Sequence, residues 1–75
     1  MPNIQVQMDR ERPMQFWWRG RWHQISRIED FWLDAGEWWQ GEGEKAFYRV
    51  IAGGAVYELY YDRKDNVWGM YRVYD

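Results

Sequence analysis

The sequence predicts a mainly β domain with five or six antiparallel strands in a twisted sheet or small, partly open barrel, and one short helix. Three observations support this class: apolar and polar residues alternate in short runs, glycine-containing turns separate the runs, and aromatic residues make up 21% of the chain. Each aromatic side chain buries about 150–250 Å², which suits a core built without cysteines. We expect one domain over residues 1–75.

The first expected strand is residues 4–8, "IQVQM", in which apolar and polar residues alternate. This alternation places Ile4, Val6 and Met8 on the side that faces the core. The charged segment "DRERP" that follows predicts a loop that ends at Pro13.

The run "FWWRGRW", residues 16–22, predicts a tight hairpin. A two-residue loop at Arg19-Gly20 pairs Trp18 with Arg21 and Trp17 with Trp22. The last two meet at a non-hydrogen-bonded site, where side chains approach most closely. They share the outer face, whereas the face directed at the core carries Met14, Phe16, Trp18, His23 and Ile25.

The apolar spacing changes after Ser26 and predicts the short helix, near residues 27–35. Ser26 followed by Glu29 matches a capping box, and Gly36 stands where a helix commonly ends. The acidic segment "EWWQGEGEKA" then predicts a loop anchored by Trp38 and Trp39. The apolar residues at helical spacing are Ile28, Phe31, Trp32 and Ala35.

The last third predicts a three-stranded meander. A two-residue loop at Gly53-Gly54 pairs residues 47–51 with residues 56–60, and a three-residue loop at 64–66, with Asn66 left-handed, pairs residues 57–60 with 70–73. This register aligns Arg49, Glu58 and Arg72 as one cross-strand ladder and pairs Leu59 with Tyr71 and Tyr60 with Met70. The face opposite the ladder is directed at the core and carries Tyr48, Val50, Tyr57, Leu59, Tyr61, Tyr71 and Val73.

The ladder face is too apolar for open water, so something must cover it. Its content of Tyr, Trp, Met and Arg is typical of a protein interface, and a partner protein is one explanation. Cover by residues 28–39 and cover by a ligand are the alternatives. The residues that would contact a partner are Phe47, Arg49, Tyr60, Trp68, Met70 and Arg72.

The hairpin at residues 16–22 is a second candidate site, for single-stranded nucleic acid. Trp17 and Trp22 could stack on bases while Arg19 and Arg21 contact phosphates. The alternative is that the tryptophans only clamp the hairpin. Charge favours this alternative, because the chain has a net charge of −2 and residues 29–45 contain six acids and one Lys.

The inventory of side chains favours binding over catalysis. The chain has no Cys or Thr, one Ser and one His, so nucleophilic catalysis and a zinc site lack candidates. We expect no enzymatic activity, no metal and no cofactor. No apolar run approaches the roughly 20 residues that span a bilayer, and we expect a cytoplasmic protein without membrane contact.

The run from Gly36 to Asp75 resembles the C-terminal segment of ImuB-type proteins, which are relatives of Y-family translesion polymerases. With "WRGRWHQI" it also resembles a small stand-alone bacterial domain of unknown function. The resemblance implies an accessory role, most simply protein binding in DNA repair, and brings no catalytic residues with it. The features that carry it are Trp38-Trp39, Phe47-Tyr48-Arg49-Val50, Glu58-Leu59-Tyr60, Asp62-Arg63, Trp68 and Tyr71-Arg72-Val73-Tyr74-Asp75.

Overall fold

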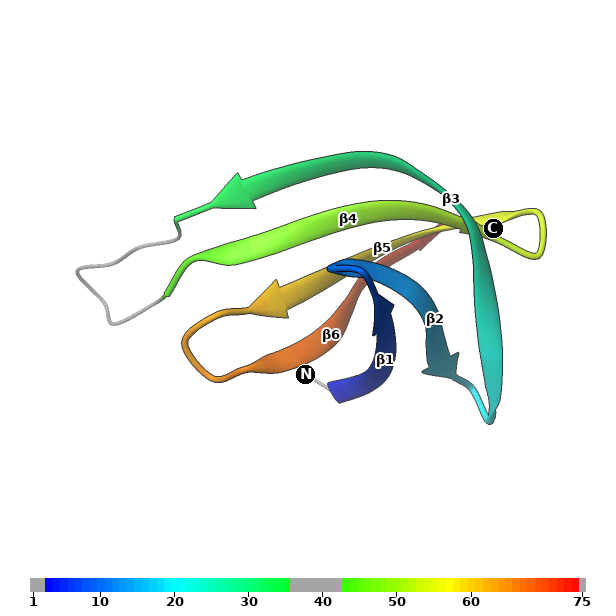
Figure 1. Ribbon diagram of the computed structural model, residues 1–75, viewed down its shortest axis with the longest axis horizontal. Coiled ribbons are helices and arrows are strands. Elements are labelled where there is room, and N and C mark those ends of the chain that lie inside the picture. Colours follow the sequence, from blue (N-terminus) through cyan, green and yellow to red (C-terminus); the bar gives the residue numbers. More distant parts are fainter. Residues whose placement is uncertain (1–2, 36–42, 75) are drawn as a thin grey trace.

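A computed structural model describes residues 3–35 and 43–74 of the chain. These residues form six antiparallel strands, which close into a small barrel in the order of the sequence (Figure 1). The predicted β class is therefore confirmed. The strands are β1 (Asn3–Asp9), β2 (Arg12–Trp18), β3 (Arg21–Asp34), β4 (Lys45–Ala52), β5 (Ala55–Asp62) and β6 (Val67–Tyr74).

Three of the turns contain two residues with positive φ, the geometry that matches the twist of a hairpin. The Arg19-Gly20 and Gly53-Gly54 loops occur as predicted. The cross-strand residue pairs predicted beside each loop are confirmed. The third turn corrects a prediction, because Arg10 and Glu11 alone connect β1 to β2. Pro13 does not end a loop but is a buried residue of β2.

A bulge in β2 corrects the predicted position of Met14. Gln7 pairs with Gln15 and Met8 pairs with Pro13, so Met14 is an extra residue without a partner on β1. The extra residue shifts the alternation, and Pro13 rather than Met14 points inward. Met14 is 40% exposed, although the sequence placed it in the core. Met8, also predicted to face the core, lines an open hollow with Tyr48 and Trp68 and is 44% exposed.

The helix predicted near residues 27–35 is wrong, because β3 continues through this segment to Asp34. Ser26 and Glu29 are bulge residues, because no residue of β4 lies opposite them in the register of the two strands. Inward positions consequently fall at Ile25, Ile28 and Phe31, and this spacing of three imitates the spacing of a helix. The predicted loop with Trp38 and Trp39 lies outside the described residues.

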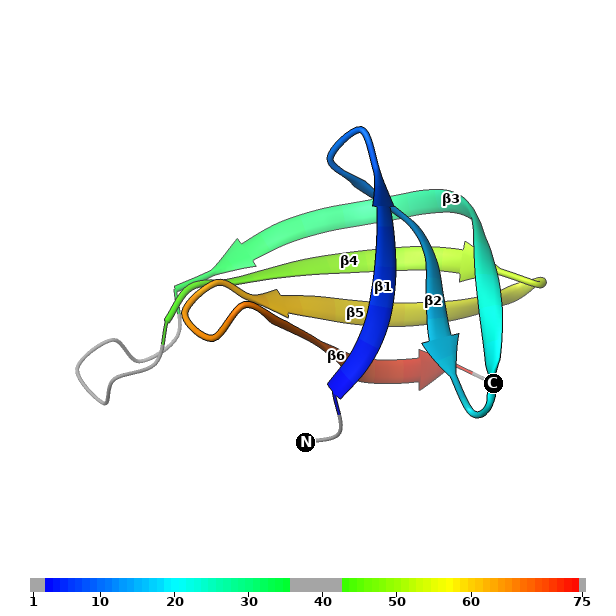
Figure 2. The same ribbon diagram turned by 60° about the horizontal axis from the view of Figure 1, so that its bottom comes forward.

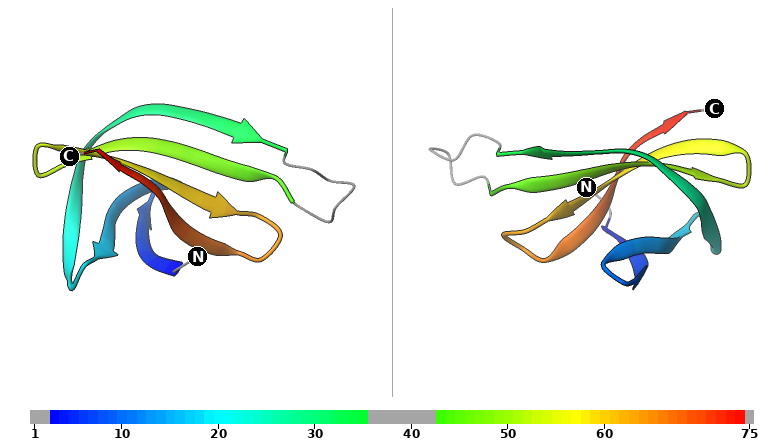
Figure 3. Two further views of the ribbon diagram at one scale, coloured as in Figure 1. Left: turned by 180° about the vertical axis from the view of Figure 1, so that it is seen from behind. Right: turned by 45° about the horizontal axis from the view of Figure 1, so that its top comes forward.

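The length of β3 allows it to belong to two parts of the barrel. Its first residues pair with β2 and its later residues pair with β4 (Figure 2). The β1–β2 hairpin therefore lies on one side of the sheet of β3–β6 (Figure 3, right). The barrel closes where Asn3 pairs with Gly69 and Ile4 pairs with Trp68.

The β5–β6 turn changes which residues of β6 face the core. The loop comprises four residues, 63–66, and Tyr71 is a bulge residue, so the predicted pairs of Leu59 with Tyr71 and of Tyr60 with Met70 are wrong. Leu59 pairs with Met70 instead. After the bulge the register is as predicted, and Glu58 faces Arg72. Trp68 and Met70 consequently point inward and Tyr71 points outward.

The core lies where the β1–β2 hairpin covers the sheet. Phe16, Val50 and Leu59 are fully buried, and the ring of Phe16 stacks on His23 with 5.1 Å between ring centroids. These residues come from β2, β4 and β5, so the core joins the hairpin to the meander. Ala52, Tyr57 and Met70 complete the buried cluster.

Candidate functional site

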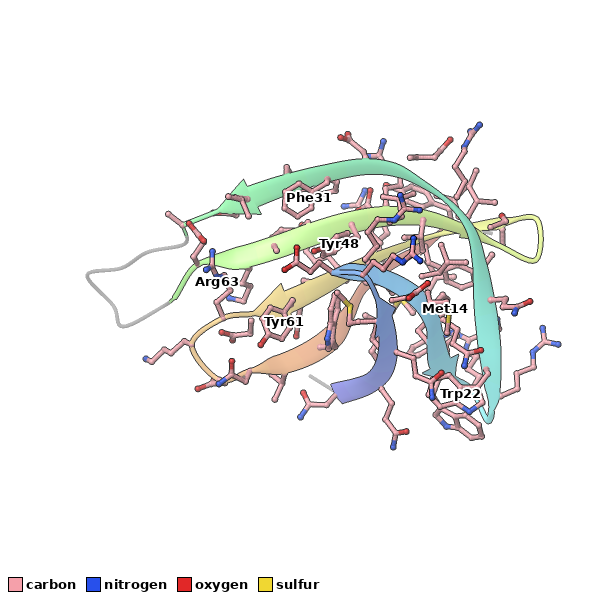
Figure 4. The ribbon with its side chains drawn as sticks, in the orientation of Figure 1. Met14, Trp22, Phe31, Tyr48, Tyr61 and Arg63 are labelled. Atoms are coloured by element: carbon pink, nitrogen blue, oxygen red, sulfur yellow. The ribbon has the colours of Figure 1, made fainter. Side chains whose placement is uncertain are left out.

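Four aromatic side chains form a continuous strip on the inner face of the sheet. Their ring centroids are 4.9 Å apart from Phe31 to Tyr48, 5.5 Å from Tyr48 to Trp68 and 5.1 Å from Trp68 to Tyr61. The rings come from β3, β4, β6 and β5, and Figure 4 shows three of them across the extended end of the sheet. We call Phe31, Tyr48, Tyr61 and Trp68 the aromatic strip.

The aromatic strip is accessible because β3–β6 extend past the end of β1 and β2 (Figure 1). Phe31 is 49% exposed, and Leu33, which follows it on the same face, is 53% exposed. An open hollow of about 660 Å³ lies over the strip. The hollow is lined by Met8, Glu11, Tyr48, Tyr61, Arg63 and Trp68.

Polar groups surround the aromatic strip. The Tyr61 hydroxyl donates a hydrogen bond of 2.8 Å to Asn66 Oδ1, which fixes the ring beside the β5–β6 turn. Arg63 forms an ion pair with Glu44 across the end of the sheet. Glu11, which lines the same hollow as Arg63, forms no ion pair within residues 3–35 and 43–74. Desolvation by burial raises the pKa of Tyr48 above its ordinary value of 10.0.

The outer face of the meander carries the predicted ladder of charged residues, held by hydrogen bonds. Glu58 is 3% exposed, and its Oε2 accepts bonds from Arg49 Nε at 2.8 Å and from the Tyr74 hydroxyl at 3.0 Å. The bond to Glu58 raises the pKa of Arg49, and a bond to Tyr74 raises the pKa of Arg72. The ladder therefore joins three strands and stabilises the sheet.

The apolar part of the outer face is closed by the chain itself. Phe47 stacks on Trp32 of β3 with 5.3 Å between ring centroids and meets Tyr71 at 4.9 Å. Tyr60 lies across Gly69. Phe47 and Tyr60 are consequently 7% and 8% exposed. Of the six residues predicted to form an interface here, Trp68 and Met70 lie on the inner face instead, since the β5–β6 loop has one residue more than predicted.

The second predicted site is divided between two faces of its hairpin. Trp17 and Trp22 lie on the outer face as predicted, edge to face at 5.6 Å, and are 40% and 37% exposed. The guanidinium of Arg19 lies 5.4 Å from the ring of Trp18, which belongs to the inner face. Arg21 is the cross-strand partner of Trp18 and shares that face. The structure therefore does not bring the arginines together with the exposed tryptophan pair.

Three residues of the aromatic strip were absent from the predicted sites. Tyr48 and Tyr61 were assigned to the inner face but were assumed to be covered, and Phe31 was assigned to a helix. The signal that could have identified them is the length of β3, because its 14 residues are twice the seven of β1 and of β2, and its later half pairs with β4 beyond the hairpin. One end of such a sheet must stay uncovered.

Two other features are absent from residues 3–35 and 43–74. No group of three or more His, Asp or Glu side chains there could hold a metal ion. None of residues 3–35 and 43–74 belongs to a helix long and apolar enough to cross a bilayer.

Comparison with known proteins places the chain in a family. No curated protein and no solved structure matches it. A family model described as a domain of unknown function, DUF6504, matches residues 3–75, which includes every strand of the barrel and the whole aromatic strip. The chain therefore belongs to the DUF6504 family of domains of unknown function.

Proposed function

We propose that this domain is a non-enzymatic binding module that holds another protein on its aromatic strip. The observation that carries the proposal is a row of four contacting aromatic rings, one exposed and three half-buried, beneath an open hollow on the inner face. A single Ser and a single His, with no Cys or Thr, support a role without catalysis.

The composition of the aromatic strip and its surroundings suits protein binding. Tyr and Trp are enriched in the energetic centres of interfaces, where they fill desolvated pockets surrounded by polar groups. Here Tyr48, Tyr61 and Trp68 form the centre, and Glu11 and Arg63 lie at the edge of the same hollow. All three rings belong to hydrogen-bonded strands, so little conformational entropy is lost when a partner binds.

The setting that we propose for this binding is DNA-damage tolerance in a bacterial cytoplasm. Its support is the resemblance of residues 36–75 to the C-terminal segment of ImuB-type proteins. Two of the shared features, Tyr48 and Trp68, belong to the aromatic strip. If the genes of close relatives regularly adjoin translesion polymerase genes, the setting gains support, and a scattered gene neighbourhood argues against it.

A random peptide library displayed on phage, selected on the immobilised domain, tests the proposed function. We expect selected peptides to shift the backbone amide resonances of β3–β6 at the aromatic strip. Phe31→Glu should abolish this binding, because it places a charge at the end of the strip. Tyr71→Glu is the matched control, since Tyr71 is equally exposed, at 49%, but lies on the outer face. Peptides that bind both variants equally would contradict the proposal.

Single-stranded nucleic acid is the alternative ligand, through Trp17 and Trp22. The placement of Arg19 beside Trp18 gives this alternative less support, because phosphates need cations on the face where the bases stack. An oligonucleotide that binds the domain more tightly at low salt, and that loses binding with Trp17→Ala, would favour it over the peptide.

A further inference from the structure

The shape of the aromatic strip restricts what can occupy it. Successive rings are tilted by 53°, 40° and 48°, so the strip is a series of shallow notches between ring edges rather than one flat platform. Notches of this kind accept compact apolar rings of an extended chain. Proline rings in the polyproline II conformation are the common example, and aromatic-lined grooves bind them with a small loss of entropy because that conformation is preformed.

Hydrogen-bond donors lie along the same strip. Neither the Tyr48 hydroxyl nor the Trp68 indole N–H makes a hydrogen bond within the part of the chain that the structure describes. A polyproline II segment has no internal hydrogen bonds, so its carbonyl groups are free to accept from such donors. The two donors are therefore matched to the backbone of an extended ligand.

Charge around the aromatic strip indicates the rest of the ligand. Glu11 lines the hollow without an ion pair among the described residues, whereas Arg63, which also lines it, is already paired with Glu44. The carboxylate of Glu11 therefore attracts a cation of the ligand and repels phosphates.

We propose that the aromatic strip binds an extended, proline-containing protein segment with an Arg or Lys beside the prolines. The prolines pack between Tyr48, Tyr61 and Trp68, and the basic side chain reaches Glu11. This inference rests on the proposed function and adds the chemistry of the partner. The carboxylate of Glu11 makes a basic segment a better occupant than an acidic one, and the chain's net charge of −2 makes it a better occupant than a nucleic acid.

The consensus of the phage-selected peptides tests the inference separately from the proposed function. We expect the peptides that lose binding to Phe31→Glu to share at least two prolines and a neighbouring Arg or Lys. A consensus that lacks proline, or that carries acidic residues, would overturn the inference while leaving protein binding at the strip intact. Selection of no peptide that is sensitive to Phe31→Glu would overturn both.

A double-mutant cycle then tests the contact with Glu11. Glu11→Gln should weaken binding of a selected synthetic peptide about two- to fivefold, the range of an exposed ion pair. The same variant should bind the peptide with its basic residue changed to Ala as the wild-type domain does. Glu29→Gln is the matched control, because Glu29 pairs with Arg27 away from the hollow. Equal losses for both peptides would exclude the proposed contact.

Discussion

The ring of Tyr60 occupies the space in which any residue other than glycine at position 69 would place its Cβ atom. This contact joins β5 to β6, where the two residues are cross-strand partners. It also explains why Tyr60, on the outer face, is only 8% exposed. The glycine therefore lets an aromatic ring close the outer face beside the seam of the barrel.

Gly69→Ala should destabilise the domain by about 1–3 kcal/mol, because the added methyl group overlaps the ring of Tyr60. Urea unfolding followed by tryptophan fluorescence measures this loss. In the background of Tyr60→Ala the same substitution should have a much smaller effect, since the overlapping ring is gone. An equal effect in both backgrounds would refute the steric explanation.

Glu58→Gln should lower the free energy of unfolding by about 1–3 kcal/mol, because a buried carboxylate that accepts two hydrogen bonds is replaced by a neutral amide. Equilibrium unfolding in urea at neutral pH measures the change. Glu29→Gln provides the control, since its ion pair with Arg27 is exposed and should contribute less than about 1 kcal/mol. Similar losses for the two variants would mean that burial of Glu58 is unimportant.

The stability of the domain should fall above about pH 10, and Tyr48 should contribute to the fall. Burial raises the pKa of Tyr48 above the ordinary value of 10.0 in the folded state, so the unfolded state loses its proton first as pH rises. The contribution of Tyr48 to the free energy of unfolding is complete below pH 10.0, and it is lost as the pH rises through the pKa of Tyr48 in the folded state. Unfolding curves at about pH 8 and about pH 11 should show a smaller fall for Tyr48→Phe than for the wild-type domain.

Trp17→Ala should destabilise the domain by about 1 kcal/mol, because the edge-to-face pair with Trp22 clamps the β2–β3 hairpin. Thermal unfolding followed by circular dichroism measures the effect. We also expect no salt-sensitive change in tryptophan fluorescence when a single-stranded oligonucleotide is added to the wild-type domain. A change that grows at low salt would indicate that the pair binds bases.

The turns made much of the fold predictable. Arg19-Gly20 and Gly53-Gly54 each contain two residues, and a loop of that length fixes the register of the strands beside it. The position of Asn66 was also predictable, because Asn tolerates the left-handed conformation that it adopts at φ 55°. These local rules depend only on neighbouring residues.

The bulges were not predictable, and they caused the principal errors. Each of Met14, Ser26, Glu29 and Tyr71 is a single extra residue that transfers the following side chains to the other face of the sheet. Whether a strand bulges depends on how it must bend to close the barrel, which is a property of the whole fold. The prediction of the candidate site contained the most errors. The bulges at Ser26 and Glu29 gave Phe31 the spacing of a helical residue, and the β5–β6 loop, one residue longer than predicted, placed Trp68 on the inner face.

Trp68 belongs both to the aromatic strip and to the closure of the barrel, where it pairs with Ile4. Only two pairs of described residues join β1 to β6, so we expect the barrel to open most readily at this junction. A ligand that holds Trp68 in place would also hold β1 against β6. Occupancy of the strip should therefore slow hydrogen exchange at Asn3 and Ile4, and the N-terminal strand would report binding to a surface formed by the other strands of the barrel.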